Sequence, residues 1–253
     1  MDHGLPCGDA EVVHSGSNVL VHLRPSPVVA RVMTGTVALH DDPRLWLSRE
    51  VEVTSYLAPT GLAVAPASMI APGPHHSEGL WLTFSSWTEV KGPTEPRDAE
   101  ELGLALRRLH EALEDFPGEL GGMLDLLEDI ERLRTQLPPS PEVDSLGDRL
   151  FALTDSVFDT PLPTRPLHGD ASLSNLLNTP LGPLWNDFED VLRGPIHWDV
   201  AGYAMAMELR GADAAFVDRA LDAYGWDTAQ DLAPFTEAHG VYGEIWQLYV
   251  RER

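Results

Sequence analysis

Two carboxylates and one amide between residues 168 and 187 have types and spacing suited to chemistry on a phosphate group. Asp170 follows His168 by two residues, Asn175 follows Asp170 by five, and Asp187 lies twelve residues further on. A positioned carboxylate can accept a hydroxyl proton and orient the attacking oxygen, which suits Asp170. An amide oxygen and a second carboxylate are hard ligands for Mg²⁺, which suits Asn175 and Asp187. These residues are suited to phosphoryl transfer to a hydroxyl with the help of Mg²⁺.

The order of these residues matches a known pair of loops. The pattern H-x-D-x-x-x-x-N, followed by an Asp-Phe pair inside a short apolar run, is typical of the catalytic and metal loops of kinases. A lone His-Gly-Asp is most often a turn, and Asn-Asp-Phe alone is a common loop tripeptide. Their conjunction, in this order and among strand-like apolar residues, favours the catalytic interpretation.

The segment resembles the signature of the aminoglycoside phosphotransferase and choline kinase-like family. Gly169 stands where protein kinases carry arginine, and residues 193–201 resemble the stretch that follows the metal loop in that family. The resemblance is strongest over residues 165–202. It implies a protein-kinase-like α+β fold with two lobes, and transfer of the γ-phosphate of ATP to a small molecule.

The same resemblance implies a role for each matched residue. Asp170 would be the catalytic base, and Asn175 and Asp187 would be the Mg²⁺ ligands. His168 and Asp199 would brace the loops by hydrogen bonds rather than act on the substrate.

The nucleotide side departs from the family pattern. The family places a lysine on the third strand, whereas this chain has Arg31 there and only one lysine in all, Lys91, in a connector. Arginine stays charged and binds phosphate bidentately, so we expect Arg31 to serve nucleotide binding. Its helix partner is expected to be Glu50, with Glu52 as the weaker alternative.

The loop expected to cover the phosphates has a single glycine. Residues 14–18 read His-Ser-Gly-Ser-Asn, so backbone amides and the hydroxyls of Ser15 and Ser17 are the predicted phosphate contacts. Residues 85–89 are the predicted hinge that receives adenine through backbone groups.

The elements before residue 90 are mostly strands. Residues 18–24 and 28–33 predict an antiparallel hairpin, and residues 79–84 predict another strand. Asp42 followed by proline predicts a helix start, with the helix running to Leu57. We expect residues 1–89 to form a nucleotide-binding lobe with a small antiparallel sheet.

The rest of the chain has helical periodicity. We expect residues 90–253 to form a larger lobe that carries the catalytic and metal loops and an acceptor pocket, so that the site lies between two lobes. Leucines at helical spacing follow a capping signal at Asp98. The predicted helices cover residues 98–113, 124–130, 143–157, 197–210, 213–224 and 235–250.

Charge and cysteine content limit the partners. The net charge is −23, and thirty-one of the forty acidic residues lie after residue 90. A nucleic-acid partner is not expected, because phosphate backbones require a basic surface. The acidity indicates either a solubilising surface or attraction of a cationic, amine-bearing acceptor. A single cysteine, Cys7, indicates a reducing compartment, and the short apolar stretches predict neither a membrane span nor a signal, so we expect a cytoplasmic protein.

Two alternatives stay open from the sequence. One is a catalytically silent nucleotide-binding protein, suggested by Arg31 and the glycine-poor loop. The other keeps the kinase chemistry and changes the acceptor to a sugar, an amino alcohol or an amino acid.

Overall fold

The chain folds into two compact units. The structure, a computed structural model, describes residues 4–38, 40, 42–91 and 98–252. One unit contains the described residues up to 91 together with Asp115–Glu119 and Asn175–Asp190. The other contains the described residues of Glu95–Glu114, Leu120–Ser174 and Val191–Arg253. The mixture of helices with an antiparallel N-terminal sheet confirms the predicted α+β class.

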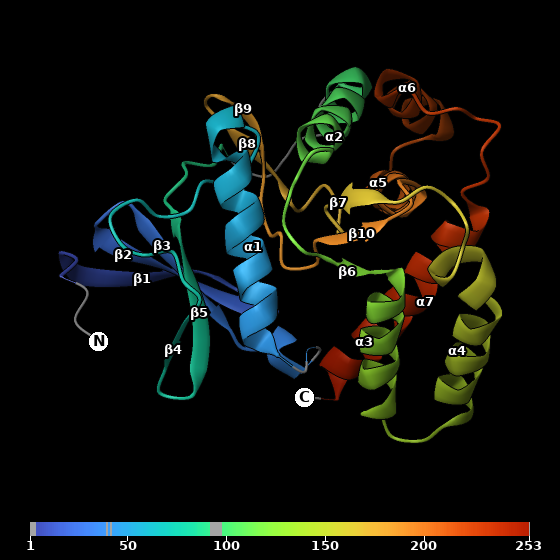
Figure 1. Cartoon of the computed structure of the whole chain (residues 1–253), viewed down its shortest axis with the longest axis horizontal. Helices are drawn as coiled ribbons and strands as arrows, with labels where there is room; N and C mark the ends of the chain where they lie inside the picture. Colours follow the sequence, from blue (N-terminus) through green and yellow to red (C-terminus); the bar gives the residue numbers. More distant parts are fainter. Residues whose placement is uncertain (1–3, 39, 41, 92–97, 253) are drawn as a thin grey trace. The chain divides into compact units, whose positions relative to one another are not determined.

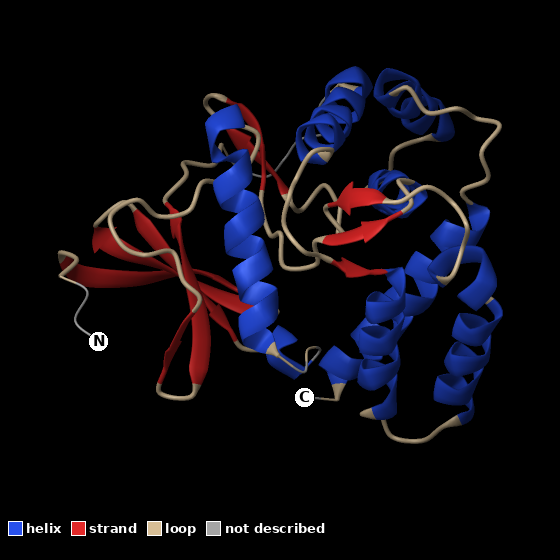
Figure 2. Ribbon diagram, viewed as in Figure 1, coloured by secondary structure: helices blue, strands red, loops and turns tan. Residues whose placement is uncertain are grey.

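The first unit is built on a five-stranded antiparallel sheet (Figures 1 and 2). Its strands lie in the order β1-β2-β3-β5-β4. Their bounds are β1 Cys7–Ser15, β2 Asn18–Pro25, β3 Val28–Met33, β4 His75–Ser77 and β5 Leu80–Ser86. The predicted hairpin is therefore present as β2 and β3, in which Leu20 pairs with Arg31. This register places Arg31 in the middle of a central strand.

One helix accompanies this sheet. Helix α1 spans Pro43–Leu57, and its N-cap Asp42 accepts hydrogen bonds from the backbone amides of Arg44 and Leu45. The cap satisfies amides that have no partner inside the helix, and the proline at the first position loses no hydrogen bond. Two short 3₁₀ turns, Thr36–Ala38 and Ala58–Thr60, flank the helix.

A separate hairpin in the first unit carries two of the predicted site residues. Strands β8 (Leu176–Thr179) and β9 (Gly182–Trp185) pair antiparallel, with Leu176 opposite Trp185. The amide of Asn186 donates to the carbonyl of Asn175 at 2.8 Å, which extends the ladder by one step beyond the strands. The hairpin thus brings Asn175, just before β8, close to the backbone next to Asp187, just after β9.

The second unit is mainly helical, with a small three-stranded sheet of order β6-β10-β7 (Figure 2). The strands are β6 Gly121–Gly122, β7 Arg165–Leu167 and β10 Leu192–Gly194. The helices are α2 Ala99–Leu113, α3 Met123–Thr135, α4 Pro141–Ala152, α5 His197–Leu209, α6 Ala214–Tyr224 and α7 Ala233–Arg251. Within the described residues, no helix is both long enough and apolar enough to span a membrane.

The structure departs from the sequence prediction in several strands and in one helix. Strands β1 and β4 were not predicted, and neither were the short strands β6, β7 and β10. The helix predicted over residues 143–157 ends as α4 at Ala152 and continues as a π-helical turn over Thr154–Phe158. The predicted connector around Lys91 lies mostly outside the described residues.

Helices α2 and α6 approach so closely that only glycine fits at residue 103. A Cβ atom there would overlap the carbonyl oxygen of Ala220. We expect Gly103→Ala to lower the free energy of unfolding by about 1–3 kcal/mol through overpacking, measured by denaturant unfolding. The matched control is Gly240→Ala in α7, where a Cβ meets no atom within 4 Å. That change should be neutral or stabilising, and equal effects of the two substitutions would contradict this packing account.

Candidate functional site

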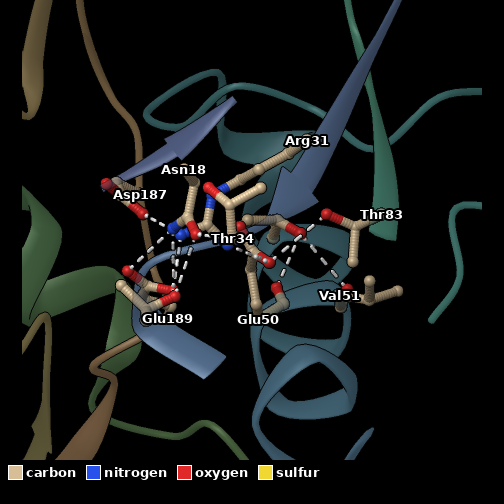
Figure 3. Close-up of polar contacts among 10 residues, drawn as sticks. Asn18, Arg31, Thr34, Glu50, Val51, Thr83, Asp187 and Glu189 are labelled. Atoms are coloured by element: carbon tan, nitrogen blue, oxygen red, sulfur yellow. Dashed lines mark hydrogen bonds and ion pairs between the residues drawn. The ribbon is translucent and has the colours of Figure 1, made fainter. Parts of the chain in front are cut away.

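Arg31 is the centre of a buried charge cluster in the first unit (Figure 3). Its Nη1 lies 3.3 Å from Glu50 on α1. Its Nη2 lies 2.9 Å from Asp187 and 2.5 Å from Glu189, both just after β9. One guanidinium therefore contacts three carboxylates from two distant segments of the chain.

Burial and charge act against each other in this cluster. Burial alone would lower the pKa of Arg31, but Glu189, Glu50 and Asp187 outweigh it and hold the pKa well above its ordinary value. Burial raises the pKa of Glu50 to about 7, even though the charge of Arg31 opposes the shift. The nearby carboxylates of Asp187 and Glu189 also contribute to this rise of the pKa. Glu50 is thus the weakly paired member of the cluster.

This shift predicts a pH dependence of stability. The folded-state pKa of Glu50 lies above its ordinary value of 4.5, so the folded protein binds more protons between pH 4.5 and about 7. The free energy of unfolding should therefore fall as pH rises through that window, by up to about 3 kcal/mol. Denaturant unfolding at pH 5 and pH 8 measures it. Glu50→Gln should flatten the profile, whereas Glu52→Gln, exposed two residues later, should not. An unchanged slope in Glu50→Gln would disprove the assignment.

Glu189 is held by further contacts. Asn18 Nδ2 donates to its two carboxylate oxygens at 3.3 and 3.4 Å. The hydroxyl of Thr36 lies 3.1 Å from Glu189 Oε2 and 3.0 Å from Asn18 Oδ1. Asn18 Oδ1 also accepts from the amide of Thr34 at 3.1 Å (Figure 3). These contacts fix the start of β2, and with it the loop before it, to the segment after β9.

Asn175 and Asp187 flank the open end of the β8–β9 hairpin. Asp187 has a left-handed backbone conformation, with φ of 64°, which is uncommon for a residue other than glycine. Its ion pair with Arg31 helps to hold this conformation. Asn175 is buried, and its carbonyl accepts from Asn186 next to Asp187. A carboxylate and an amide at adjacent positions fit the needs of Mg²⁺, which keeps waters and binds through one or two protein oxygens plus phosphates. Among the described residues, no three His, Cys, Asp or Glu side chains converge on a metal position.

The predicted phosphate-covering loop joins β1 to β2. Ser15 ends β1, and Ser17 precedes β2, with both residues exposed. The carbonyl of Ser17 accepts from the amide of Gly35 at 2.6 Å. The two hydroxyl-bearing residues therefore stand at the tip of a sheet hairpin, in the same unit as Arg31.

In the second unit, a buried carboxylate holds the loop that carries Asp170. Asp199, at the start of α5, accepts from the amides of His168 at 2.8 Å and Gly169 at 2.9 Å. The indole Nε1 of Trp198 donates to the carbonyl of Gly169 at 2.7 Å. Asp170, which follows directly, is exposed.

A hydrogen-bonded chain supports Asp199 from behind. His110 Nε2 lies 2.9 Å from the Asp199 carboxylate, and His110 Nδ1 lies 2.8 Å from the hydroxyl of Tyr224. Burial opposes ionisation of Asp199, but the bonds from His110 and His168 keep its pKa below the ordinary value. Burial, followed by the charge of Asp199, raises the pKa of Tyr224 to about 12, so its hydroxyl remains a donor. The carboxylate is thus ionised and saturated with donors, as a structural anchor requires.

Asp170 also lines a cavity of 290 Å³ in the second unit. One wall is the loop that begins at Asp170, and the other walls come from α5 and α7. The lining residues are Asp170 to Ser174 from the loop, Gly202, Met205, Ala206, Leu209 and Arg210 from α5 and the turn after it, and His239 from α7. The predicted base therefore faces a space of the size of a small ligand.

Three participants were not predicted from the sequence: Glu189 as a partner of Arg31, Tyr224 behind His110, and His239 in the cavity. Only Glu189 had a usable signal. It is an acidic residue only two positions after Asp187, in the predicted metal loop. The other contacts join residues far apart in sequence.

The chain has the protein-kinase-like fold. The chain belongs to the phosphotransferase enzyme family, whose pattern matches residues 14–235. The predicted family resemblance is thereby confirmed. No curated protein sequence matches the chain significantly.

Solved structures of kinases share the fold at low sequence identity. A choline kinase from Streptococcus pneumoniae has a TM-score of 0.73 and 15% identity, covering 99% of this chain and 88% of that one. An amicoumacin kinase, solved with AMP-PNP and Ca²⁺, has a TM-score of 0.75 and 12% identity, covering 95% and 81%. An aminoglycoside-3'-phosphotransferase of type VIII has a TM-score of 0.67 and 18% identity, covering 94% and 95%.

Proposed function

We propose that the protein is an ATP-dependent small-molecule kinase that transfers the γ-phosphate to a hydroxyl of its acceptor. The observation that carries the proposal is the pairing of Asn175 with Asp187 at the open end of the β8–β9 hairpin, next to the Arg31 cluster. A protein that only binds nucleotide has no need for this pair. The family and the fold of the kinases described above support the same reaction type.

In the proposed reaction the acceptor oxygen forms a bond to the γ-phosphorus as the bond to the bridging β–γ oxygen breaks. Asp170 accepts the hydroxyl proton and orients the attacking oxygen. Its exposure and its place on the cavity wall suit contact with an acceptor. His168 and Asp199 brace this loop without touching the acceptor.

Asn175 and Asp187 would hold Mg²⁺, which, when bound, neutralises charge on the nucleotide phosphates. Ser15 and Ser17 are proposed to contact the nucleotide phosphates, and Arg31 with Glu50 supports the nucleotide side through the cluster that holds Asp187. By this division residues 1–89 bind the nucleotide, and residues 90–253 supply the base and the acceptor pocket. The single cysteine suits a cytoplasmic setting.

The acceptor is proposed to be a small hydroxyl compound that bears an amine. A screen for ADP release over aminoglycosides, peptide antibiotics, sugars, amino alcohols and hydroxy-amino acids tests the reaction directly. We expect Mg²⁺-dependent ADP release with at least one amine-bearing compound. ADP release with neutral sugars alone would contradict the proposal that the acceptor bears an amine. ADP release by Asp170→Asn at the wild-type rate would contradict the proposed role of Asp170 as the base.

A further inference from the structure

The cavity beside Asp170 does not have the chemistry of a polycation site. Among its described lining residues the charged ones are Asp170 and Arg210, which leave no net charge. The acidic residues of the helices after residue 90 do not line it. Met205, Ala206 and Leu209 supply an apolar wall. The groups that line the cavity favour a ligand with an apolar portion and little positive charge. Specificity depends on the groups that touch the ligand rather than on the net charge of the whole protein.

His239 is fixed in this cavity as an uncharged residue. Its Nε2 donates to the carbonyl of Trp198 at 2.9 Å, and its ring stacks on the Trp198 indole at 3.8 Å between centroids. The ring also lies against Gly202, where an added Cβ would come within 2.8 Å of it. Burial lowers the pKa of His239, so it contributes no cation near neutral pH and keeps Nδ1 as an acceptor.

We propose, on the basis of the proposed kinase function, that the acceptor has a net charge of zero or −1 and a short apolar portion. Its anionic group would bind Arg210 at the cavity wall. An amine is compatible only when an acid balances it, as in a hydroxylated amino acid. A polycation such as an aminoglycoside is disfavoured, because Asp170 is the only carboxylate among the described residues that line the cavity, and the reaction requires it as the base.

The test compares kcat/KM for three probes: L-homoserine as a zwitterion, ethanolamine as a single cation, and kanamycin as a polycation. We expect the highest value for the zwitterion. Arg210→Glu should raise the KM for it by about tenfold or more, with kcat changed little, because a charge-assisted contact is lost. Arg219→Glu on α6, outside the cavity lining, alters the net charge equally and should leave KM unchanged.

The highest kcat/KM with kanamycin would overturn the acceptor class, as would an unchanged KM in Arg210→Glu. Either result leaves the kinase assignment intact. Failure of the wild-type protein to bind Mg²⁺–ATP would instead contradict the proposed function.

A second, independent inference concerns Arg31. A guanidinium has five N–H groups. Both hydrogens of Nη2 face carboxylates, at 2.9 Å from Asp187 and 2.5 Å from Glu189, and Nη1 is directed to Glu50. Arg31 is only 8% exposed, so little of its guanidinium remains for a phosphate.

We infer that Arg31 is a positioning residue for the metal loop and that Glu189 is its principal counter-ion. Glu189 takes up the charge of Arg31, which leaves Asp187 able to bind a cation. Without Glu189, the guanidinium would pair mainly with Asp187 and compete with Mg²⁺. Arginine suits this role because its fork reaches two segments at once, whereas the single ammonium of lysine does not.

The test is the Mg²⁺ concentration needed for ATP to stabilise the protein against thermal unfolding. We expect Glu189→Gln to raise it by about tenfold or more, since charge-assisted contacts of this kind typically exceed that factor. Glu50→Gln, which alters the longer contact to the same guanidinium, should raise it less than about threefold. Arg31→Lys should behave like Glu189→Gln.

If Arg31→Lys needs no more Mg²⁺ than the wild type, this inference is overturned, because a positive charge of any shape would then be enough to position the metal loop. Equal effects of Glu189→Gln and Glu50→Gln would do the same. A wild-type protein with no Mg²⁺-dependent stabilisation would instead count against the kinase assignment.

Discussion

Replacing Asp170 by asparagine should reduce kcat by about 10²–10⁴-fold, the usual contribution of a positioned base. Asparagine keeps the size of the side chain and removes the proton acceptor. The KM for ATP should change little, because Asp170 is assigned to the acceptor hydroxyl. ADP release under saturating ATP and acceptor measures the loss.

Stability separates this effect from misfolding. Asp170 is exposed, so Asp170→Asn should keep the wild-type melting temperature. Ser172→Ala, in the same loop and also on the cavity wall, is the matched control and should retain most of the activity. A kcat within a few-fold of wild type in Asp170→Asn would mean that another group accepts the proton.

Replacing Arg31 by methionine should lower the free energy of unfolding by about 3–5 kcal/mol, as expected when one partner of a buried ion pair is removed. The substitution keeps the apolar stem but leaves Glu50, Glu189 and Asp187 without their shared cation. Urea unfolding at pH 8, above the pKa of about 7 of Glu50, measures the loss.

The double variant Arg31→Met with Glu189→Gln provides the control for this prediction. The second substitution removes one of the carboxylate charges that Arg31→Met leaves unpaired. It should therefore restore part of the free energy of unfolding, and a double-mutant cycle measures how much. Strict additivity of the two single substitutions would contradict the direct coupling of Arg31 to Glu189. Arg24→Met is the surface reference, because Arg24 and its partner Glu11 are each about half exposed.

Much of the fold was accessible from local sequence signals. Asp42 and Pro43 marked the start of α1, and the leucine spacing after Asp98 marked α2, because both signals act within a few residues. Strand β1 gave no such signal, since its residues are all exposed and carry no alternation. Strands β6, β7 and β10 are two or three residues long and depend on their partners rather than on their own composition.

The candidate site likewise combines residues that the sequence predicts with contacts that it does not. Asp170, Asn175 and Asp187 could be predicted as site residues because the roles assigned to them fix short spacings along the chain. The contact of Arg31 with Glu189 spans residues far apart in sequence, and so does the contact of His110 with Asp199. Contacts of this kind depend on how the chain folds back, so residue types alone do not reveal them. The placement of charge also depends on how the chain folds, because the acidity of the sequence as a whole did not predict a cavity lining without net charge.

The most direct test of the account is whether ATP stabilises the protein in a Mg²⁺-dependent manner. Thermal unfolding would be followed during ATP titration, with Mg²⁺ and with EDTA, in the wild type and in Asp187→Asn. We predict that ATP raises the melting temperature strongly only with Mg²⁺, and that Asp187→Asn abolishes the Mg²⁺-dependent part. Equal stabilisation with EDTA, or none in either condition, would contradict the assignment of Asn175 and Asp187 as metal ligands and favour a catalytically silent protein.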